Sequence, residues 1–342
     1  MNKYILTVIS STILWSNLSI ANTLPEPAQQ FANFSECRLI SGKVIAPCRI
    51  GYRTYGILNT NKSNTILVPT WFTGTSANHA YLASAELLNP EKYFIVIVDA
   101  LGNGVSTSPS NSETQSGEQF PQINITDMVV SQHKLLTEKL GIQSLHGVVG
   151  LSMGGMQAFE WAVRYPDFAD RTIATIGSPR LPTFDIALWH TRNRLLALYR
   201  ECQCKEVLEV IAGMRMLGTV PTKLTQTVAR EDTISTITSR AISNTMTVAK
   251  SWDIQRQAEA MIHHNIARDF DNDLQKAAAK INTKFLIVVG DDDRVVTPQP
   301  AREFAVLIGA TVLELDEDCG HSDPWCAPDI FAQAVSSFID KD

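Results

Sequence analysis

Gly150-Leu151-Ser152-Met153-Gly154-Gly155 stands between an apolar run that ends in Val148-Val149 and a segment with helical spacing. A G-x-S-x-G motif between a strand and a helix is typical of a nucleophile elbow, a sharp turn that exposes the serine oxygen. Only residues without bulk fit where the strand and the helix pack closely, and the three glycines meet that need. The N-terminus of the helix also favours negative charge beside the serine. The stretch therefore predicts Ser152 as a nucleophile.

Short apolar runs and helical segments alternate outward from this motif in both directions. Apolar runs that predict strands lie at residues 65–68, 94–98, 148–149, 173–176, 285–289 and 312–315. Helical spacing covers residues 124–140 and stops at Gly141, and Thr297 before Pro298 predicts the N-cap of a later helix. Apolar and polar residues alternate along residues 38–44 and 49–55, as in an antiparallel pair of strands. The alternation predicts an α/β fold with a mostly parallel central sheet flanked by helices.

Residues 181–280 break this alternation, because they show helical patterns and no clear strand. An all-helical insertion between two strands would cover the carboxyl ends of the sheet, where open α/β sheets bind ligands. We therefore expect a signal peptide at 1–21, the first part of the core at 22–180, a helical cap at 181–280 and the second part of the core at 281–342.

The first residues have the features of a secretory signal peptide. Lys3 supplies the positive charge, residues 5–15 are apolar, and Ser19-Ile20-Ala21 offers small residues before a cleavage site. The alternative is an uncleaved anchor helix, but the apolar stretch is shorter than the roughly 20 residues that span a bilayer. The sequence thus predicts an exported protein, periplasmic or secreted, without a stable membrane span after the signal is removed.

Composition limits the classes of partner. The chain has 342 residues, 44% of them hydrophobic, which is enough for one large core with an insertion. The net charge of −6 and the absence of a basic run argue against nucleic acid as a partner. No cofactor is predicted.

The six cysteines are an even number, and in an oxidising compartment they predict disulfides. Pairing of neighbours is the simplest connectivity: Cys37–Cys48, Cys202–Cys204 and Cys319–Cys326. A zinc site made by Cys319, His321 and Cys326 is the alternative. No fourth ligand has convincing spacing, so we predict no metal.

A serine nucleophile needs a base, and the base needs an orienting acid, which in this arrangement follow in the order serine, acid, histidine. Of seven histidines, His321 fits best, because it lies in a loop after a late strand. The strand at 285–289 runs through Gly290 into three aspartates. Loop spacing favours Asp293 as the acid, while Asp291 and Asp292 stay open as alternatives.

The developing oxyanion needs backbone N–H donors. Met153, which follows the nucleophile, supplies one. The second should come from the loop after residues 65–68, where we select Phe72.

Several further motifs resemble the homoserine O-acetyltransferases of the α/β-hydrolase fold and their hydrolase relatives. The matching stretches are Tyr52-Arg53-Thr54-Tyr55-Gly56, Asp99-Ala100-Leu101-Gly102-Asn103-Gly104, Ser106-Thr107-Ser108-Pro109, Asp127-Met128-Val129, residues 150–157, Trp161-Ala162 and Tyr165-Pro166. The resemblance implies an α/β-hydrolase fold with Ser152, Asp293 and His321 as a triad. It also implies Phe72 and Met153 as oxyanion donors and a possible homodimer through cap helices.

The chain departs from the acetyltransferases near the expected substrate. Those enzymes carry an aspartate directly after the catalytic histidine, where this chain has Ser322, with Asp323 one place later. Arg215 matches a substrate-binding arginine of the family, but residues 220–222 offer no tyrosine. Trp71, Arg215 and Asp323 are the candidate substrate-binding residues.

These departures, together with export, favour a serine acyl hydrolase of the esterase or thioesterase type. Its partner would be a small-molecule acyl ester or thioester that acylates Ser152. The alternative is an acyl-CoA-dependent O-acyltransferase such as homoserine O-acetyltransferase. A second alternative is a non-catalytic binding protein on the same scaffold.

Overall fold

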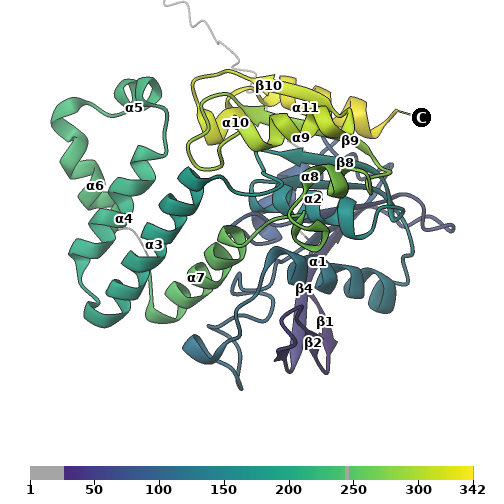
Figure 1. Cartoon of the computed structure of the whole chain (residues 1–342), viewed down its shortest axis with the longest axis horizontal. Helices are drawn as coiled ribbons and strands as arrows, with labels where there is room; N and C mark the ends of the chain where they lie inside the picture. Colours follow the sequence, from purple (N-terminus) through teal and green to yellow (C-terminus); the bar gives the residue numbers. More distant parts are fainter. Residues whose placement is uncertain (1–26, 243–245, 342) are drawn as a thin grey trace, which may run out of the picture.

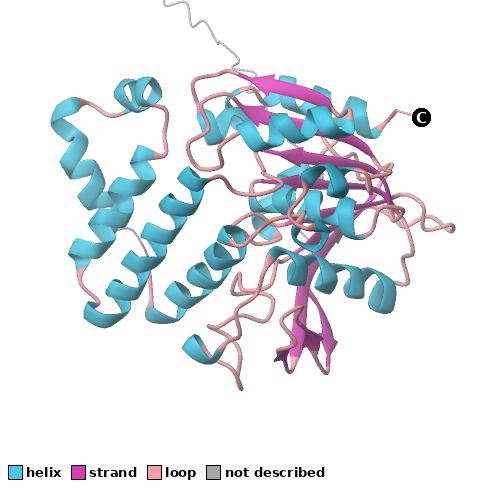
Figure 2. Cartoon of the chain, viewed as in Figure 1, coloured by secondary structure: helices cyan, strands magenta, loops and turns pink. Residues whose placement is uncertain are grey.

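An eight-stranded sheet runs through the part of the chain that the structure describes (Figures 1 and 2). The computed structural model describes residues 27–242 and 246–341. In sheet order the strands are β1 (Gln30–Phe34), β4 (Cys48–Tyr55), β6 (Phe94–Val98), β5 (Thr65–Pro69), β7 (Leu145–Leu151), β8 (Ala169–Thr175), β9 (Lys284–Gly290) and β10 (Thr311–Leu315). From β6 to β10 neighbouring strands are parallel. This confirms the predicted mostly parallel sheet; the predicted signal peptide, residues 1–21, lies outside the described residues.

The predicted pairing of residues 38–44 with 49–55 is wrong. β4 lies antiparallel between β1 and β6, and β2 (Cys37–Arg38) pairs with β3 (Val44–Ile45) in a separate small sheet. Alternation along a segment marks a strand but does not select its partner. The Cys37–Cys48 disulfide joins β2 to the start of β4.

Helices cover both faces of the large sheet. One face packs against α1 (Ile125–Lys134), α2 (Met153–Arg164) and α9 (Gln299–Ile308), and the other packs against α11 (Pro328–Ile339). In β5, Leu67 belongs to the first of these cores, whereas Ile66 and Val68 belong to the second. Side chains of a strand point to alternate faces. Because both faces are covered, the strand is apolar from Ile66 to Pro69, as expected for a buried parallel strand.

The helix predicted over residues 124–140 is confirmed. Asn124 and Asp127 form a capping box, in which each side chain accepts a hydrogen bond of 3.0 Å from the other residue's N–H. After α1 the chain continues as the π-helix η3 (Leu135–Leu140) and stops at Gly141, whose φ is 63°. The remaining short helices of the core are η1 (Ala77–Leu82), η2 (Gly117–Gln119), η6 (Gly320–Ser322) and α10 (Asp323–Cys326).

The segment between β8 and β9 is helical, and we call its residues 181–280 the cap. Its helices are α3 (Thr183–Cys202), α4 (Lys205–Leu217), α5 (Pro221–Thr227), η4 (Arg230–Asp232), α6 (Thr233–Ile242), α7 (Val248–Ile262), η5 (Arg268–Phe270) and α8 (Leu274–Ala278). Figure 1 shows α3 to α6 projecting to one side of the sheet. Among the described residues, none of the helices is both long and apolar enough to cross a membrane.

Two buried carboxylates tie the cap to the core. Asp185 on α3 accepts hydrogen bonds from the Thr297 N–H at 2.9 Å and from its hydroxyl at 2.5 Å. Asp253 on α7 accepts the Ser110 N–H at 2.8 Å and its hydroxyl at 2.5 Å. Burial raises the pKa of each carboxyl to about 6. The predicted N-cap at Thr297 is wrong, because its hydroxyl bonds Asp185 and α9 begins at Gln299.

We expect Asp253→Asn to change how the stability of the chain depends on pH. The pKa of this carboxyl rises from 3.8 to about 6 on folding, so between these values the folded chain binds more protons than the unfolded chain. The free energy of unfolding therefore falls as pH rises through this window. Asparagine does not titrate, so the variant lacks this loss. The free energy of unfolding of the variant minus that of wild type should therefore rise by up to about 3 kcal/mol between pH 4 and pH 7.

Denaturant unfolding at both pH values measures this difference. Asp232→Asn, which changes an exposed carboxylate of the cap, is the matched control. A stability difference between Asp253→Asn and wild type that is the same at both pH values would contradict the expectation.

Candidate active site

Ser152 occupies the turn between β7 and α2. Its φ of 56° lies in the left-handed region that residues with a side chain rarely adopt. A Cβ atom at position 150 would lie 2.0 Å from the Gly154 carbonyl oxygen, and one at position 154 would lie 2.5 Å from the Pro69 carbonyl oxygen. Neither position can hold a side chain, so the glycines allow the strand and the helix to approach. The strand, turn and helix expected around Ser152 are all present.

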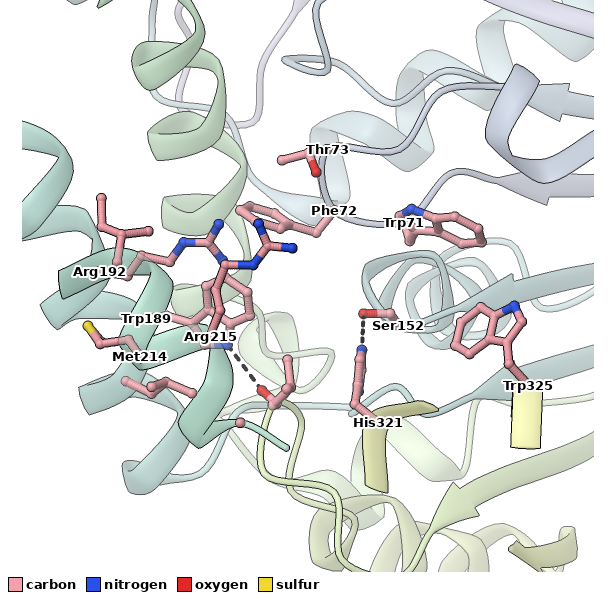
Figure 3. Close-up of a pocket in the computed structure, with 14 residues that line it drawn as sticks. Trp71, Phe72, Thr73, Ser152, Trp189, Arg192, Met214, Arg215, His321 and Trp325 are labelled. Atoms are coloured by element: carbon pink, nitrogen blue, oxygen red, sulfur yellow. Dashed lines mark hydrogen bonds between the residues drawn. The ribbon is translucent and has the colours of Figure 1, made fainter. Parts of the chain in front are cut away.

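Ser152, His321 and Asp293 form one chain of hydrogen bonds (Figure 3 shows the first two). His321 Nε2 lies 2.9 Å from Ser152 Oγ, and His321 Nδ1 lies 2.6 Å from Asp293 Oδ2. With Nδ1 donating to the carboxylate, Nε2 is free to accept the serine proton. The structure thus brings together three residues, from the turn after β7, from the loop after β9 and from η6.

The local contacts distinguish Asp293 from the two neighbouring aspartates. Asp293 is buried, and its Oδ1 accepts the N–H groups of Val295 and Val296 at 2.8 and 2.9 Å. These bonds fix its other oxygen on His321. Asp291 instead forms an exposed ion pair with Arg302 at 2.6 Å, and Asp292 is exposed.

His321 lies between the two cysteines of a disulfide. The structure contains the bonds Cys37–Cys48, Cys202–Cys204 and Cys319–Cys326, which confirms the predicted pairing of neighbours. The alternative zinc site is wrong, because Cys319 and Cys326 are bonded to each other and have no thiolate to offer a metal. No cluster of three potential metal ligands occurs in the described residues.

The loop after β5 presents an unused N–H beside Ser152. Among the described residues, neither Phe72 nor Met153 donates its backbone N–H to a protein acceptor. The amides on either side of Phe72 are both occupied: the Trp71 N–H donates to His79 Nε2 at 3.1 Å, and the Thr73 N–H donates to Gln257 Oε1 at 2.7 Å.

His79 and Gln257 hold this loop from opposite sides. Burial lowers the pKa of His79 to about 4, so its ring is neutral near pH 7, and Nδ1 donates to the Thr75 carbonyl at 2.9 Å. Gln257, on cap helix α7, also donates to the Leu101 carbonyl at 3.1 Å. The sequence offered no sign of either role, since both depend on contacts between distant segments.

We expect Gln257→Met to lower kcat for a neutral ester by about 10-fold with a smaller change in KM, because small displacements of a stabilising group have large effects on rate. The variant leaves the Thr73 N–H without its acceptor, which frees the Phe72 amide to move. Gln255→Met is the matched control, since within residues 27–242 and 246–341 the Gln255 side chain bonds only Arg200 and Glu259, both in the cap. Unchanged kcat in folded Gln257→Met would show that the loop needs no support from the cap.

Ser152 opens into a cavity of about 380 Å³ between the core and the cap. The core contributes Trp71, Phe72, His321 and Trp325, and the cap contributes apolar and basic side chains of α3 and α4 (Figure 3). No aspartate or glutamate of the described residues lines this cavity.

Two of the three candidate substrate-binding residues, Trp71 and Arg215, line the cavity, but Asp323 does not. Asp323 is buried, and its Oδ1 accepts the Cys319 N–H at 2.9 Å. The side chain therefore supports the loop of His321 instead of facing a substrate. Arg192 also lines the cavity, one helical turn after Trp189 on α3. Sequence reasoning missed Arg192, and its helical spacing from Trp189 was the signal that could have placed it on the same face of the helix.

Comparisons with known proteins agree with this architecture. A family model described as alpha/beta hydrolase fold matches residues 65–194. An ethyl acetate hydrolase of Pseudomonas veronii is 44% identical over 154 residues, which are 44% of this chain and 44% of that protein. A homoserine O-acetyltransferase of Geotalea daltonii is 36% identical over 165 residues, 43% of this chain and 45% of that protein.

A solved structure of an acetyl esterase matches over most of both chains. It has a TM-score of 0.82 and 28% identity, and covers 92% of this chain and 96% of that chain. The two sequence alignments, in contrast, span less than half the length of the curated relatives. The chain has the α/β-hydrolase fold, and it resembles both esterases and homoserine O-acetyltransferases, as the sequence motifs predicted.

Proposed function

We propose that this α/β-hydrolase-fold chain is a serine esterase that removes acyl groups from small-molecule esters. The observation that carries the proposal is the hydrogen-bonded chain from Ser152 through His321 to Asp293, which opens into a cavity beside two unused N–H groups. Such a chain is the arrangement that activates a serine for acyl transfer.

The reaction would proceed in two halves. Ser152 Oγ attacks the ester carbonyl while His321 Nε2 takes its proton, and the carbonyl oxygen becomes an oxyanion held by the N–H groups of Phe72 and Met153. The C–O bond to the alcohol then breaks, and the alcohol leaves with the proton from His321. Water attacks the acyl-enzyme with His321 again as base, which releases the carboxylic acid and restores Ser152.

Water, and not an alcohol, is the proposed acceptor. Transfer to homoserine would need a bound amino acid, whose ammonium group calls for a carboxylate partner. The cavity has none among the described residues, since Asp323 bonds the Cys319 N–H. An acyl-CoA-dependent O-acyltransferase is the second candidate, because relatives named homoserine O-acetyltransferase also resemble the chain.

Hydrolysis of p-nitrophenyl acetate by the mature protein tests the proposal, together with labelling by a fluorophosphonate. We expect release of nitrophenol and labelling at Ser152. Absence of both would favour the non-catalytic binding protein. Addition of acetyl-CoA and homoserine separates the two enzymes: O-acetylhomoserine formed faster than acetyl-CoA is hydrolysed would support the transferase.

We also propose that the chain acts outside the cytoplasm. Three disulfides in the described residues support this, since such bonds persist in oxidising compartments. The homodimer and the use of thioesters stay predictions.

A further inference from the structure

Cap helix α3 contacts the loop that carries the acid of the triad. We call residues 291–298, between β9 and α9, the acid loop. Near the start of α3, Asp185 accepts two hydrogen bonds from Thr297, one from the N–H at 2.9 Å and one from the hydroxyl at 2.5 Å. One helical turn later, Trp189 Nε1 donates to the Val295 carbonyl at 3.2 Å. Two side chains of the cap therefore hold the acid loop at neighbouring positions.

The same segment positions the carboxylate of Asp293, whose Oδ1 accepts the N–H groups of Val295 and Val296. The peptide group between Val295 and Val296 belongs to both sets of bonds. Its carbonyl accepts from Trp189 Nε1, and its N–H donates to Asp293 Oδ1. Because a peptide group is planar, a shift of its carbonyl also moves its N–H. A single rigid group thus connects the cap to the carboxylate that bonds His321.

These bonds lie in the interior of the chain. Asp185, Trp189 and Asp293 are buried, so a lost bond would leave a buried polar group unpaired and favour a shift of the loop. Burial raises the pKa of Asp185 to about 6, against the effect of the bonds from Thr297. The charges of Asp293 and His321 also act on this carboxyl, which therefore lies within electrostatic range of the triad.

Trp189 also contacts the loop of the second oxyanion donor. The centre of its ring lies 4.9 Å from that of Phe72, with the two ring planes 69° apart. Figure 3 shows the two residues next to each other at the edge of the cavity. One cap side chain thus contacts the acid loop through its N–H and the residue of the proposed oxyanion donor through its ring.

We propose that Asp185 and Trp189 are positioning residues, which hold the acid loop so that Asp293 stays bonded to His321. Neither side chain takes part in a bond that forms or breaks in the reaction. The inference rests on the proposed esterase function, since it concerns the same triad. It gives the start of α3 a role in the support of the acid, besides its place in the wall of the cavity.

Thr297→Val tests the proposal at a position outside the cavity lining. Valine keeps the branched shape and the N–H of threonine but lacks the hydroxyl that bonds Asp185. We expect kcat for p-nitrophenyl acetate to fall about 10- to 100-fold with a smaller change in KM, since a displacement of about 1 Å at a catalytic group has an effect of this size. Thr297→Ser keeps the hydroxyl and should keep most of the wild-type activity.

Ser110→Ala is the matched control for a loosened cap. It removes the hydroxyl bond of 2.5 Å to Asp253, the other buried carboxylate that ties the cap to the core. We expect this variant to retain kcat, because the bond lies outside the acid loop. Thermal unfolding checks that each variant is folded. Equal losses of kcat in folded Ser110→Ala and Thr297→Val would show a general effect of the cap and overturn the inference.

A double-mutant cycle shows whether the effect acts through Asp293. In the Asp293→Asn background the acid is already lost, so the addition of Thr297→Val should cause little further loss of kcat. The full loss in that background would indicate a purely structural role and overturn the inference. Trp189→Phe removes the Nε1 donor and keeps an aromatic ring beside Phe72. It is expected to behave in the same way, and it decides the question if Thr297→Val does not fold.

Proton NMR separates this inference from the proposed function, because it needs no turnover. The His321 Nδ1 proton in the 2.6 Å bond to Asp293 should give a far-downfield signal that Asp293→Asn removes. We expect this signal to shift or weaken in Thr297→Val and to persist in Ser110→Ala. That pattern in a chain that hydrolyses no ester would support the positioning role and refute only the esterase. Ester hydrolysis by wild type with kcat unchanged in both Thr297→Val and Trp189→Phe would refute only the positioning role.

Discussion

Ser152→Ala is expected to lower kcat for p-nitrophenyl acetate by about 10⁶-fold, the effect of removing the nucleophile from a serine triad. The hydroxyl oxygen, 2.9 Å from His321 Nε2, is the atom that forms the acyl-enzyme, and alanine offers no substitute. Stopped assays over hours measure the residual rate, and mass spectrometry follows the covalent adduct. The variant should fold normally, since a smaller side chain at the turn adds no contact.

Ser239→Ala, at an exposed position of α6, is the control and should retain full activity. Retention of more than about one-hundredth of the wild-type rate by Ser152→Ala would mean that the ester is cleaved elsewhere, since removal of a triad nucleophile leaves only weak catalysis by the remaining groups.

The second large effect is expected at Asp293. In Asp293→Asn the amide can present its NH₂ group to His321 Nδ1, which would place the ring proton on Nε2 and leave no base for Ser152. Loss of the correct tautomer in a serine triad lowers kcat by about 10⁴-fold. Steady-state kinetics on p-nitrophenyl acetate measures this.

Asp291→Asn and Asp292→Asn are the matched controls, because they change the neighbouring carboxylates of the same loop. Asp291→Asn loses only the exposed ion pair with Arg302, so each control should retain activity within a few-fold of wild type. If activity were lost in one of these two controls and kept in Asp293→Asn, the aspartate changed in that control would be the acid of the triad.

The fold could be predicted from the sequence wherever a local pattern decides the structure. The apolar runs of β5, β6 and β9 are buried on both faces, and the glycines at 150 and 154 have contacts that exclude any side chain. The partner of β4 could not be predicted, because hydrogen bonding between strands depends on which segments meet in the folded chain. The prediction of Thr297 as a helix N-cap was wrong for the same reason, because its hydroxyl bonds Asp185, which is 112 residues away in the sequence.

The residues of the site also fall into those that the sequence predicts and those that depend on contacts between distant segments. Ser152 and His321 follow from a motif and from chain order, and the pairing of Cys319 with Cys326 follows from proximity. The choice of Asp293 as the acid depended on loop spacing, which does not exclude Asp291 or Asp292. The bonds from the Val295 and Val296 N–H groups to Asp293 distinguish it from both. The roles of His79 and Gln257 could not be assigned, because their surroundings come from segments far apart in the chain, and helical spacing from Trp189 was the one sequence signal for Arg192. Asp323 lies next to the expected position, but burial turns it toward the backbone.

The bond from the cap residue Gln257 to the Thr73 amide has a consequence for engineering. One way to alter the specificity of such a chain would be to graft the cap of a relative onto this core. Here the insertion also shapes the scaffold's own anion-stabilising loop, so a transplanted segment without an amide oxygen at the equivalent place would deliver a new substrate to an impaired catalyst. Chimeras should therefore be designed with that glutamine retained.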